Sequence, residues 1–149
     1  MIITEISNIF NGHERAYIYI ILSKSYRAVY VGETNDRRGT IGRFRAHIGS
    51  YGTFRKRFEE RINEDLENID DLTLLSYLLP SEQLYTSVAS TYRQSVEYLV
   101  QIKLLERRAS LDKAFKVISE VRTFSTTSEK KVDKLAEAIA LDFINYYKA

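Results

Sequence analysis

Two tyrosine-bearing apolar stretches and a group of arginines stand within residues 16–47, and together they could act on a phosphate. Arg43 suits this task, because a guanidinium group is always charged and binds two phosphoryl oxygens at once. Tyr19 could position a water molecule or, if its pKa is lowered, take a proton from it. His47 could relay a proton near neutral pH. The alternative is a β-hairpin whose tyrosines only pack and whose arginines are solvated.

The alternation of side chains along a strand predicts that the tyrosines share faces with a glycine. Tyr17 and Tyr19 are two residues apart in the first stretch, and Tyr30 and Gly32 are two residues apart in the second. If the pairing register joins these faces, the tyrosines surround a position that has no side chain. A glycine within a strand often marks the close approach of a ligand or another backbone. We therefore take Tyr17 and Gly32 as structural residues at the site.

Positive charge is concentrated in one segment of a chain whose net charge is only +2. Between Arg37 and Arg57 there are seven lysines and arginines and no acidic residue. Such a segment could attract a polyanion and follow a phosphate backbone, although it could equally be a solvated helix surface. The residues predicted to contact nucleic acid are Arg37, Arg38, Arg45, Arg55, Lys56 and Arg57.

Residue composition, turn residues and apolar spacing predict the elements that must position these residues. Strands are expected at 17–22 and 29–33, followed by a short helix over 41–48 and a second helix capped by Thr53. A buried strand at 72–79 precedes the only proline, Pro80. A long helix is expected over 90–107 and a last helix over 129–147, with an unassigned stretch at 110–121 and a polar break at 125–128.

This order of elements predicts a mixed α/β protein. We expect a small, mainly antiparallel three-stranded sheet flanked by helices, with a helical C-terminal extension. Residues 1–108 would form the first domain, and residues 109–149 would form the extension packed on that same domain.

The linear order of the residues resembles the GIY-YIG endonuclease superfamily. Tyr17-Ile18-Tyr19 matches the Gly-Ile-Tyr strand of that family, and Tyr30-Val31-Gly32 matches its Tyr-Ile-Gly strand. Arg43 and His47 follow one helical turn apart, as the family's arginine and histidine often do. The resemblance covers residues 16–105. It departs from the family where Tyr17 replaces the first glycine and where Glu33 puts a negative charge near the expected phosphate.

The resemblance also implies a metal ligand and a set of catalytic residues. The glutamate that binds metal in this family lies on a helix after the third strand, and Glu97 is the matching residue. A carboxylate suits Mg²⁺ or Mn²⁺, which complete their coordination with water and substrate oxygens. The alternative for Glu97 is a contact with Arg93 or Gln101 at the boundary of the helix. The catalytic residues implied are Tyr19, Tyr30, Arg43, His47 and Glu97.

The expected function is that of a divalent-metal-dependent endonuclease in which water attacks a DNA phosphodiester. RNA remains an open alternative as substrate, and backbone contacts carry no information on a recognition sequence. Two other functions are kept. One is a catalytically inactive nucleic-acid-binding module with the GIY-YIG fold, and the other is a protein-interaction domain whose C-terminal helix joins two copies as a homodimer.

Composition argues against several other classes of protein. There is no cysteine, hence no disulfide framework and no thiolate metal site. The sequence has no clustered histidines for zinc, no glycine-rich phosphate loop and no convincing Ser/His/Asp set. The first residues do not match a secretory signal, and no apolar stretch approaches the roughly 20 residues that span a bilayer. We therefore expect a cytoplasmic protein that does not bind membranes.

Overall fold

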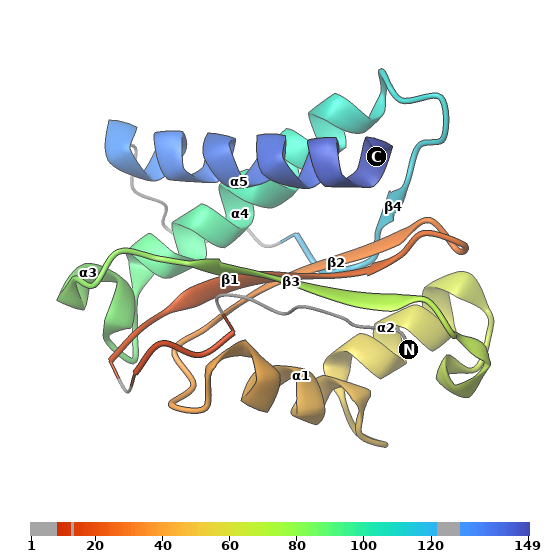
Figure 1. Ribbon diagram of the computed structural model, residues 1–149, viewed down its shortest axis with the longest axis horizontal. Coiled ribbons are helices and arrows are strands. Elements are labelled where there is room, and N and C mark those ends of the chain that lie inside the picture. Colours follow the sequence, from red (N-terminus) through yellow and green to blue (C-terminus); the bar gives the residue numbers. More distant parts are fainter. Residues whose placement is uncertain (1–8, 13, 122–128) are drawn as a thin grey trace, which may run out of the picture.

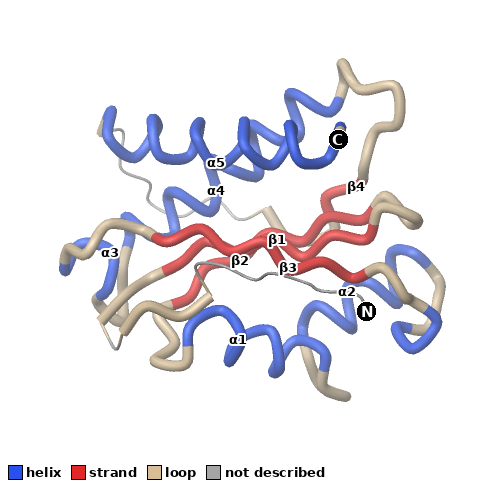
Figure 2. Tube along the Cα trace, in the orientation of Figure 1, coloured by secondary structure: helices blue, strands red, loops and turns tan. Residues whose placement is uncertain are grey.

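The computed structural model describes residues 9–12, 14–121 and 129–149, and these form a mixed α/β structure in three layers. A four-stranded sheet lies between two pairs of helices (Figure 1). On one face lie α1 (Gly39–Ile48) and α2 (Thr53–Ile62), and on the other lie α4 (Thr91–Arg108) and α5 (Lys130–Lys148), as Figure 2 shows. The predicted α/β class is confirmed.

The sheet contains one strand more than the sequence predicted. β1 (Tyr17–Ser23) pairs antiparallel with both β2 (Ala28–Thr34) and β3 (Leu72–Leu78). β4 (Lys116–Val117) runs parallel to β2, so the strand order is β3-β1-β2-β4 and the sheet is mixed. The predicted number of three strands is wrong, because β4 lies in the stretch that hydrophobic periodicity left unassigned. Two residues are too few to show a period.

The helices agree with the sequence pattern except at some ends. Gly52, not Thr53, is the N-cap of α2, and that helix ends where Asn63 adopts a left-handed conformation with φ of 60°. Leu66, four residues beyond the end of α2, lies in a separate short 3₁₀ helix, η1 (Leu66–Asn68). A further short helix, α3 (Gln83–Thr86), precedes α4. At the start of α4 the Ser90 hydroxyl accepts the N–H of Arg93 at 3.0 Å. The polar break expected at 125–128 lies outside the described residues.

Two hydrophobic cores lie on the two faces of the sheet. Aliphatic side chains from alternate positions of β1 and β2 enter a core under α4 and α5, and the intervening positions enter a core over α1 and α2 that is rich in aromatic residues. Helix α5 buries its apolar face in the first core, so the C-terminal segment adds both a strand and a helix to this structure. Within the described residues, no helix has the length and apolar character needed to cross a membrane.

Candidate functional site

A cleft of about 450 Å³ follows the edge of β2 beyond the end of β4. β4 pairs with Ala28 and Val29 only, and the next part of β2 lines the cleft. Helices from both layers complete its walls. Three of the predicted catalytic residues, Tyr30, Arg43 and Glu97, lie together here. The full lining is Tyr30, Val31, Glu33, Arg43, Thr53, Arg57, Gln94, Glu97, Tyr98, Gln101, Ser119 and Glu120.

The segment after β4 supplies part of this lining that sequence reasoning missed. The hydroxyl of Ser119 accepts the N–H of Val31 at 3.1 Å and donates to Oε1 of Gln101 at 3.0 Å. These bonds satisfy the edge of β2 where β4 has ended and tie it to α4. No sequence signal identified Ser119, because its role follows from a strand only two residues long.

Tyr19 and His47 form a buried pair, with 2.6 Å between Tyr19 Oη and His47 Nε2. Each residue is only 2% exposed. The backbone N–H of Phe54 donates to His47 Nδ1 at 3.1 Å, so that nitrogen carries no proton. The neutral ring must then hold its proton on Nε2. His47 therefore donates to the Tyr19 oxygen and fixes the orientation of that hydroxyl.

The surroundings of His47 keep its ring neutral. Burial lowers the pKa of His47 to about 4, and the nearby Arg43 cation acts in the same direction. At neutral pH both ring nitrogens are engaged and neither has a proton to exchange freely. This arrangement favours an orienting role for His47 over the proton relay expected from the sequence.

Gly32 gives the Tyr19 ring the space that it occupies. Tyr19 and Gly32 are direct partners in the β1–β2 register. A Cβ atom at position 32 would lie 2.2 Å from both Cζ and Oη of Tyr19, so any other residue would displace the ring. The close approach predicted at Gly32 is thus made by a side chain of the neighbouring strand and not by a ligand or another backbone. Tyr17 is fully buried, and its hydroxyl accepts the N–H of Asn11 at 2.6 Å.

The two tyrosines of the motif have different surroundings. Their rings stack with centroids 6.5 Å apart, and Tyr30 also meets His47 edge-on at 5.1 Å. Burial raises the pKa of Tyr19 well above its usual value, and Tyr30 and Glu97 add to this while Arg43 opposes it. Tyr19 is therefore a neutral phenol at pH 7. Tyr30 is the tyrosine of this pair that lines the cleft.

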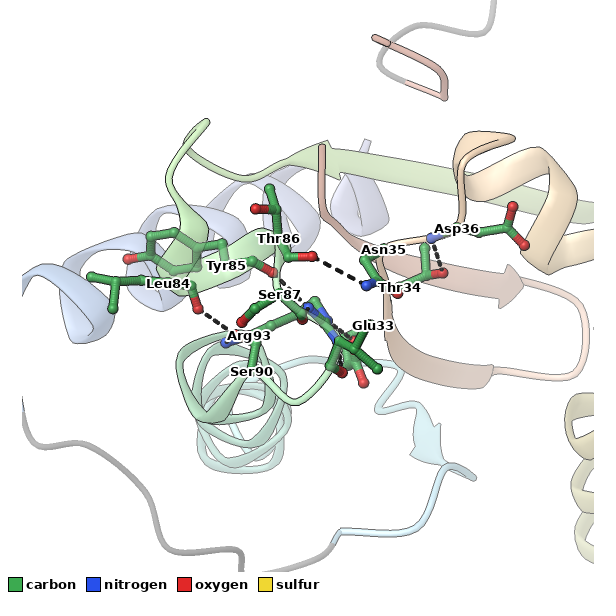
Figure 3. A network of polar contacts seen from close by, with 11 residues as sticks. Glu33, Thr34, Asn35, Asp36, Leu84, Tyr85, Thr86, Ser87, Ser90 and Arg93 are labelled. Carbon is green, nitrogen blue, oxygen red and sulfur yellow. Dashed lines mark hydrogen bonds and ion pairs between the residues drawn. The ribbon is translucent and has the colours of Figure 1, made fainter. Parts of the chain in front are cut away.

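Glu33 is held by a buried arginine on α4. Arg93 is 3% exposed, and its Nε donates to a carboxylate oxygen of Glu33. Figure 3 shows this pair between the end of β2 and the start of α4. The sequence left Arg93 as a partner for Glu97, but its guanidinium contacts Glu33 instead. The negative charge of Glu33 at the cleft is therefore balanced within the fold.

The remaining donors of Arg93 fix the segment that leads into α4. Its Nη1 and Nη2 atoms donate to three backbone carbonyls at 2.6, 2.8 and 3.1 Å. Asn35 adds a bond from its side-chain amide to the carbonyl of Thr86 at 3.2 Å (Figure 3). Residues 83–90 are thus tied to the end of β2 at one side of the cleft. The three carbonyls belong to Tyr85, Ser87 and Val88.

Half of the predicted nucleic-acid-binding residues have anionic partners in the fold. Arg38 pairs with Asp36 at 3.1 Å, and Arg57 pairs with Glu120 at 2.8 Å. Arg55 pairs with a glutamate at 2.7 Å, and its Nε and Nη2 atoms donate to the Ile48 carbonyl at 3.0 and 2.9 Å. That glutamate is Glu67. The other three, Arg37, Arg45 and Lys56, are exposed.

The lining of the cleft suits a hard divalent cation. Its side chains offer carboxylate, amide and hydroxyl oxygens and include neither sulfur nor imidazole. Within the described residues there is no cluster of three or more acidic, histidine or cysteine side chains that could hold a metal. Mg²⁺ does not need one, because it commonly binds one or two carboxylates and keeps waters and substrate phosphate as its other ligands. A site built on Glu97 therefore fits Mg²⁺ or Mn²⁺.

Comparisons of this chain with protein-family models, with curated proteins and with solved structures gave no match. The GIY-YIG resemblance of the sequence therefore stays a prediction, and the site is interpreted from its own geometry.

Proposed function

We propose that the protein is a divalent-metal-dependent endonuclease that hydrolyses DNA phosphodiester bonds in the cleft beside β2. The observation that carries this proposal is the convergence of Tyr30, Arg43 and Glu97 on one cleft from β2, α1 and α4. For water attack on a phosphodiester, a phenol can position the water, a guanidinium can stabilise charge on the phosphoryl oxygens and a carboxylate can hold a metal ion. The GIY-YIG resemblance supports the same assignment.

Arg43 is assigned to the phosphoryl group. Its guanidinium lies at the cleft and interacts with the Tyr19 hydroxyl, which is also hydrogen-bonded to His47. Held in this way, the guanidinium is placed to neutralise charge that develops on the phosphoryl oxygens during attack. Loss of such a preorganised donor typically lowers turnover by about 10² to 10³-fold.

Tyr30 is assigned to the attacking water. Sequence reasoning assigned this task to Tyr19, with Tyr30 as a supporting hydroxyl implied by the GIY-YIG resemblance. The burial of Tyr19 and its raised pKa favour an exchange of roles, because Tyr30 reaches the cleft and Tyr19 holds Arg43. Tyr30 would orient the water for attack on phosphorus, after which the bond to the leaving oxygen breaks.

Glu97 is assigned to the cation; Mg²⁺ or Mn²⁺ held there would supply positive charge at the phosphoryl oxygens. Glu33, which also lines the cleft, pairs with Arg93. The cleft thus combines one residue for the metal, one for the phosphate and one for the water.

A second candidate is a nucleic-acid-binding module without cleavage. The observation that favours it is the state of Tyr19, which is buried, neutral and bound to His47. Such a protein would bind DNA in a salt-dependent manner and leave it intact.

A protein-interaction domain would bind no DNA. The apolar face of α5 is already packed in the core, and Leu141 and Tyr146 are its exposed large side chains for the predicted homodimer.

The direct test is the nicking of supercoiled plasmid with Mg²⁺ or Mn²⁺, set against an EDTA control. Wild-type protein should convert the plasmid to open circles only when the metal is present. Tyr30→Phe should lower this rate by about 10²-fold, a loss typical of a positioned acid–base group. Tyr26→Phe is the matched control, because Tyr26 packs on Phe58 and does not line the cleft.

Two outcomes would redirect the assignment. Plasmid binding without nicking under any divalent metal would favour the binding module. Nicking by Tyr30→Phe at the wild-type rate would remove Tyr30 from the reaction and return the water to Tyr19.

A further inference from the structure

Tyr51 is the most exposed large apolar side chain in the described part of the chain, with a relative exposure of 102%. It lies in the turn between α1 and α2, which is closed by a hydrogen bond from the Gly52 N–H to the Gly49 carbonyl at 2.9 Å. A single exposed aromatic residue needs no special explanation by itself. The surroundings of this one, however, connect it to the cleft.

The turn that carries Tyr51 is fixed against the candidate site. A Cβ atom at position 52 would lie 2.0 Å from the His47 carbonyl oxygen, so the turn packs directly on the last part of α1. Two residues after Gly52, the backbone N–H of Phe54 donates a hydrogen bond to the ring of the same histidine. Thr53, two residues after Tyr51, lines the cleft. The Cα atoms of Tyr51 and Thr53 are therefore no more than about 7.6 Å apart.

The charges near Tyr51 in the sequence are all positive. The turn lies inside segment 37–57, which contains no acidic residue. Arg45 on α1 and Lys56 on α2 are exposed on either side of it in the chain. An exposed aromatic ring among exposed basic side chains is the combination that binds single-stranded nucleic acid, with the cations following the backbone and the ring stacking on a base.

We propose that Tyr51 stacks on an unpaired nucleobase next to the phosphate held at the cleft. A base offers its face to a side chain only where it is not stacked in a duplex. The substrate class is therefore DNA with a single-stranded segment, such as a flap, a gap or an open end, and not continuous duplex. This inference rests on the proposed function, since the cleft is its reference point.

The test uses the absence of tryptophan from the sequence. Tyr51→Trp places the only tryptophan of the chain at the turn, where it can be excited separately from the tyrosines, and a stacked base should quench its emission. The probes are a single-stranded oligothymidylate and a relaxed, covalently closed circular plasmid, both in EDTA so that the strands stay intact. The control is Leu141→Trp, at an exposed position on α5 in the opposite helical layer. Binding itself is followed separately by the anisotropy of a labelled oligonucleotide and by plasmid gel shift.

The proposal predicts saturable quenching of the tryptophan at position 51 by the oligothymidylate, none by the plasmid and none in the Leu141→Trp control. Tyr51→Ala should weaken oligothymidylate binding by about 5 to 150-fold. Tyr51→Phe keeps the aromatic ring and should bind the oligothymidylate as wild type does. Oligonucleotide binding with unchanged emission at position 51, or with equal quenching in the control, would overturn the stacking and leave the proposed function standing. If the protein binds neither the oligothymidylate nor the plasmid, both the stacking and the proposed function are overturned. Quenching with binding but without nicking in the metal assay would keep the stacking and reject the enzyme.

Discussion

The two faces of the sheet are built from the same strands and have different chemistry. Towards α4 and α5, the core residues that β1 and β2 contribute are aliphatic, each at most 1% exposed: Ile18, Ile20, Leu22, Val29 and Val31. Towards α1 and α2 the intervening positions include Tyr19 and Tyr30, which meet His47 and Phe54. The core on the aliphatic face consists of closely packed apolar side chains, whereas the aromatic face places hydroxyls and an imidazole at defined positions.

The cleft at the edge of β2 draws on both faces. Glu97 comes from the helix that covers the aliphatic face, and Arg43 comes from the helix that covers the aromatic face. The relative position of these two side chains therefore depends on the sheet between them. Substitutions in the aliphatic face should mainly change stability, and substitutions in the aromatic face should mainly change what the cleft can do.

The largest effect on stability is expected for Ile20→Ala in the aliphatic face. Ile20 is fully buried, and truncation of such a residue leaves a cavity that costs about 2 to 5 kcal/mol of unfolding free energy. Urea denaturation would measure this loss, and Tyr30→Phe on the opposite face should cost about 1 kcal/mol. Equal losses from the two substitutions would remove the distinction between the faces.

A smaller effect is expected from pH, through His47. Its folded-state pKa of about 4 lies below the ordinary value of 6.5, so the unfolded chain takes up a proton first as pH falls. Stability should thus be greatest above pH 6.5 and decrease between pH 6.5 and 4, with a slope approaching about 1.4 kcal/mol per pH unit. Unfolding curves of wild type and His47→Gln across this range would measure the difference. A slope unchanged by His47→Gln would show that this ring is not held neutral by the fold.

The smallest effects separate exposed from engaged basic residues. Lys56 is exposed, so Lys56→Ala should weaken DNA binding. The slope of log K against the logarithm of the salt concentration should become shallower by about 1, the value for one lost phosphate contact. Arg55 is occupied by the Ile48 carbonyl and Glu67, so Arg55→Ala should leave the salt dependence unchanged. Binding measured over a series of salt concentrations distinguishes the two. A lower slope for Arg55→Ala would mean that this side chain leaves its partners to bind DNA.

Local pattern predicted much of the fold but not its long-range pairs. Runs rich in tyrosine, isoleucine and valine identified β1 and β2, and apolar spacing identified the helices, because each signal lies within a few neighbouring residues. The pairs Glu33–Arg93 and Arg57–Glu120 join residues that are far apart in the chain, and only the packing of the layers brings them together. The different depths of Tyr19 and Tyr30 likewise depend on how α1 and α2 cover the sheet. Spacing indicated which residue types would gather, but not which tyrosine would reach the cleft.

The central claim, that the cleft cleaves DNA with a metal on Glu97, is tested most directly by plasmid nicking with Glu97→Gln. This change keeps the size of the side chain and removes the anionic ligand. Glu120→Gln is the matched control, because Glu120 is a second carboxylate that lines the cleft and is assigned no role with the metal. We expect Glu97→Gln to fold, to bind DNA and to show no metal-dependent nicking, while wild type and Glu120→Gln both nick. Nicking by Glu97→Gln at the wild-type rate would contradict this account and place the metal elsewhere, with Glu33 as the next carboxylate to test.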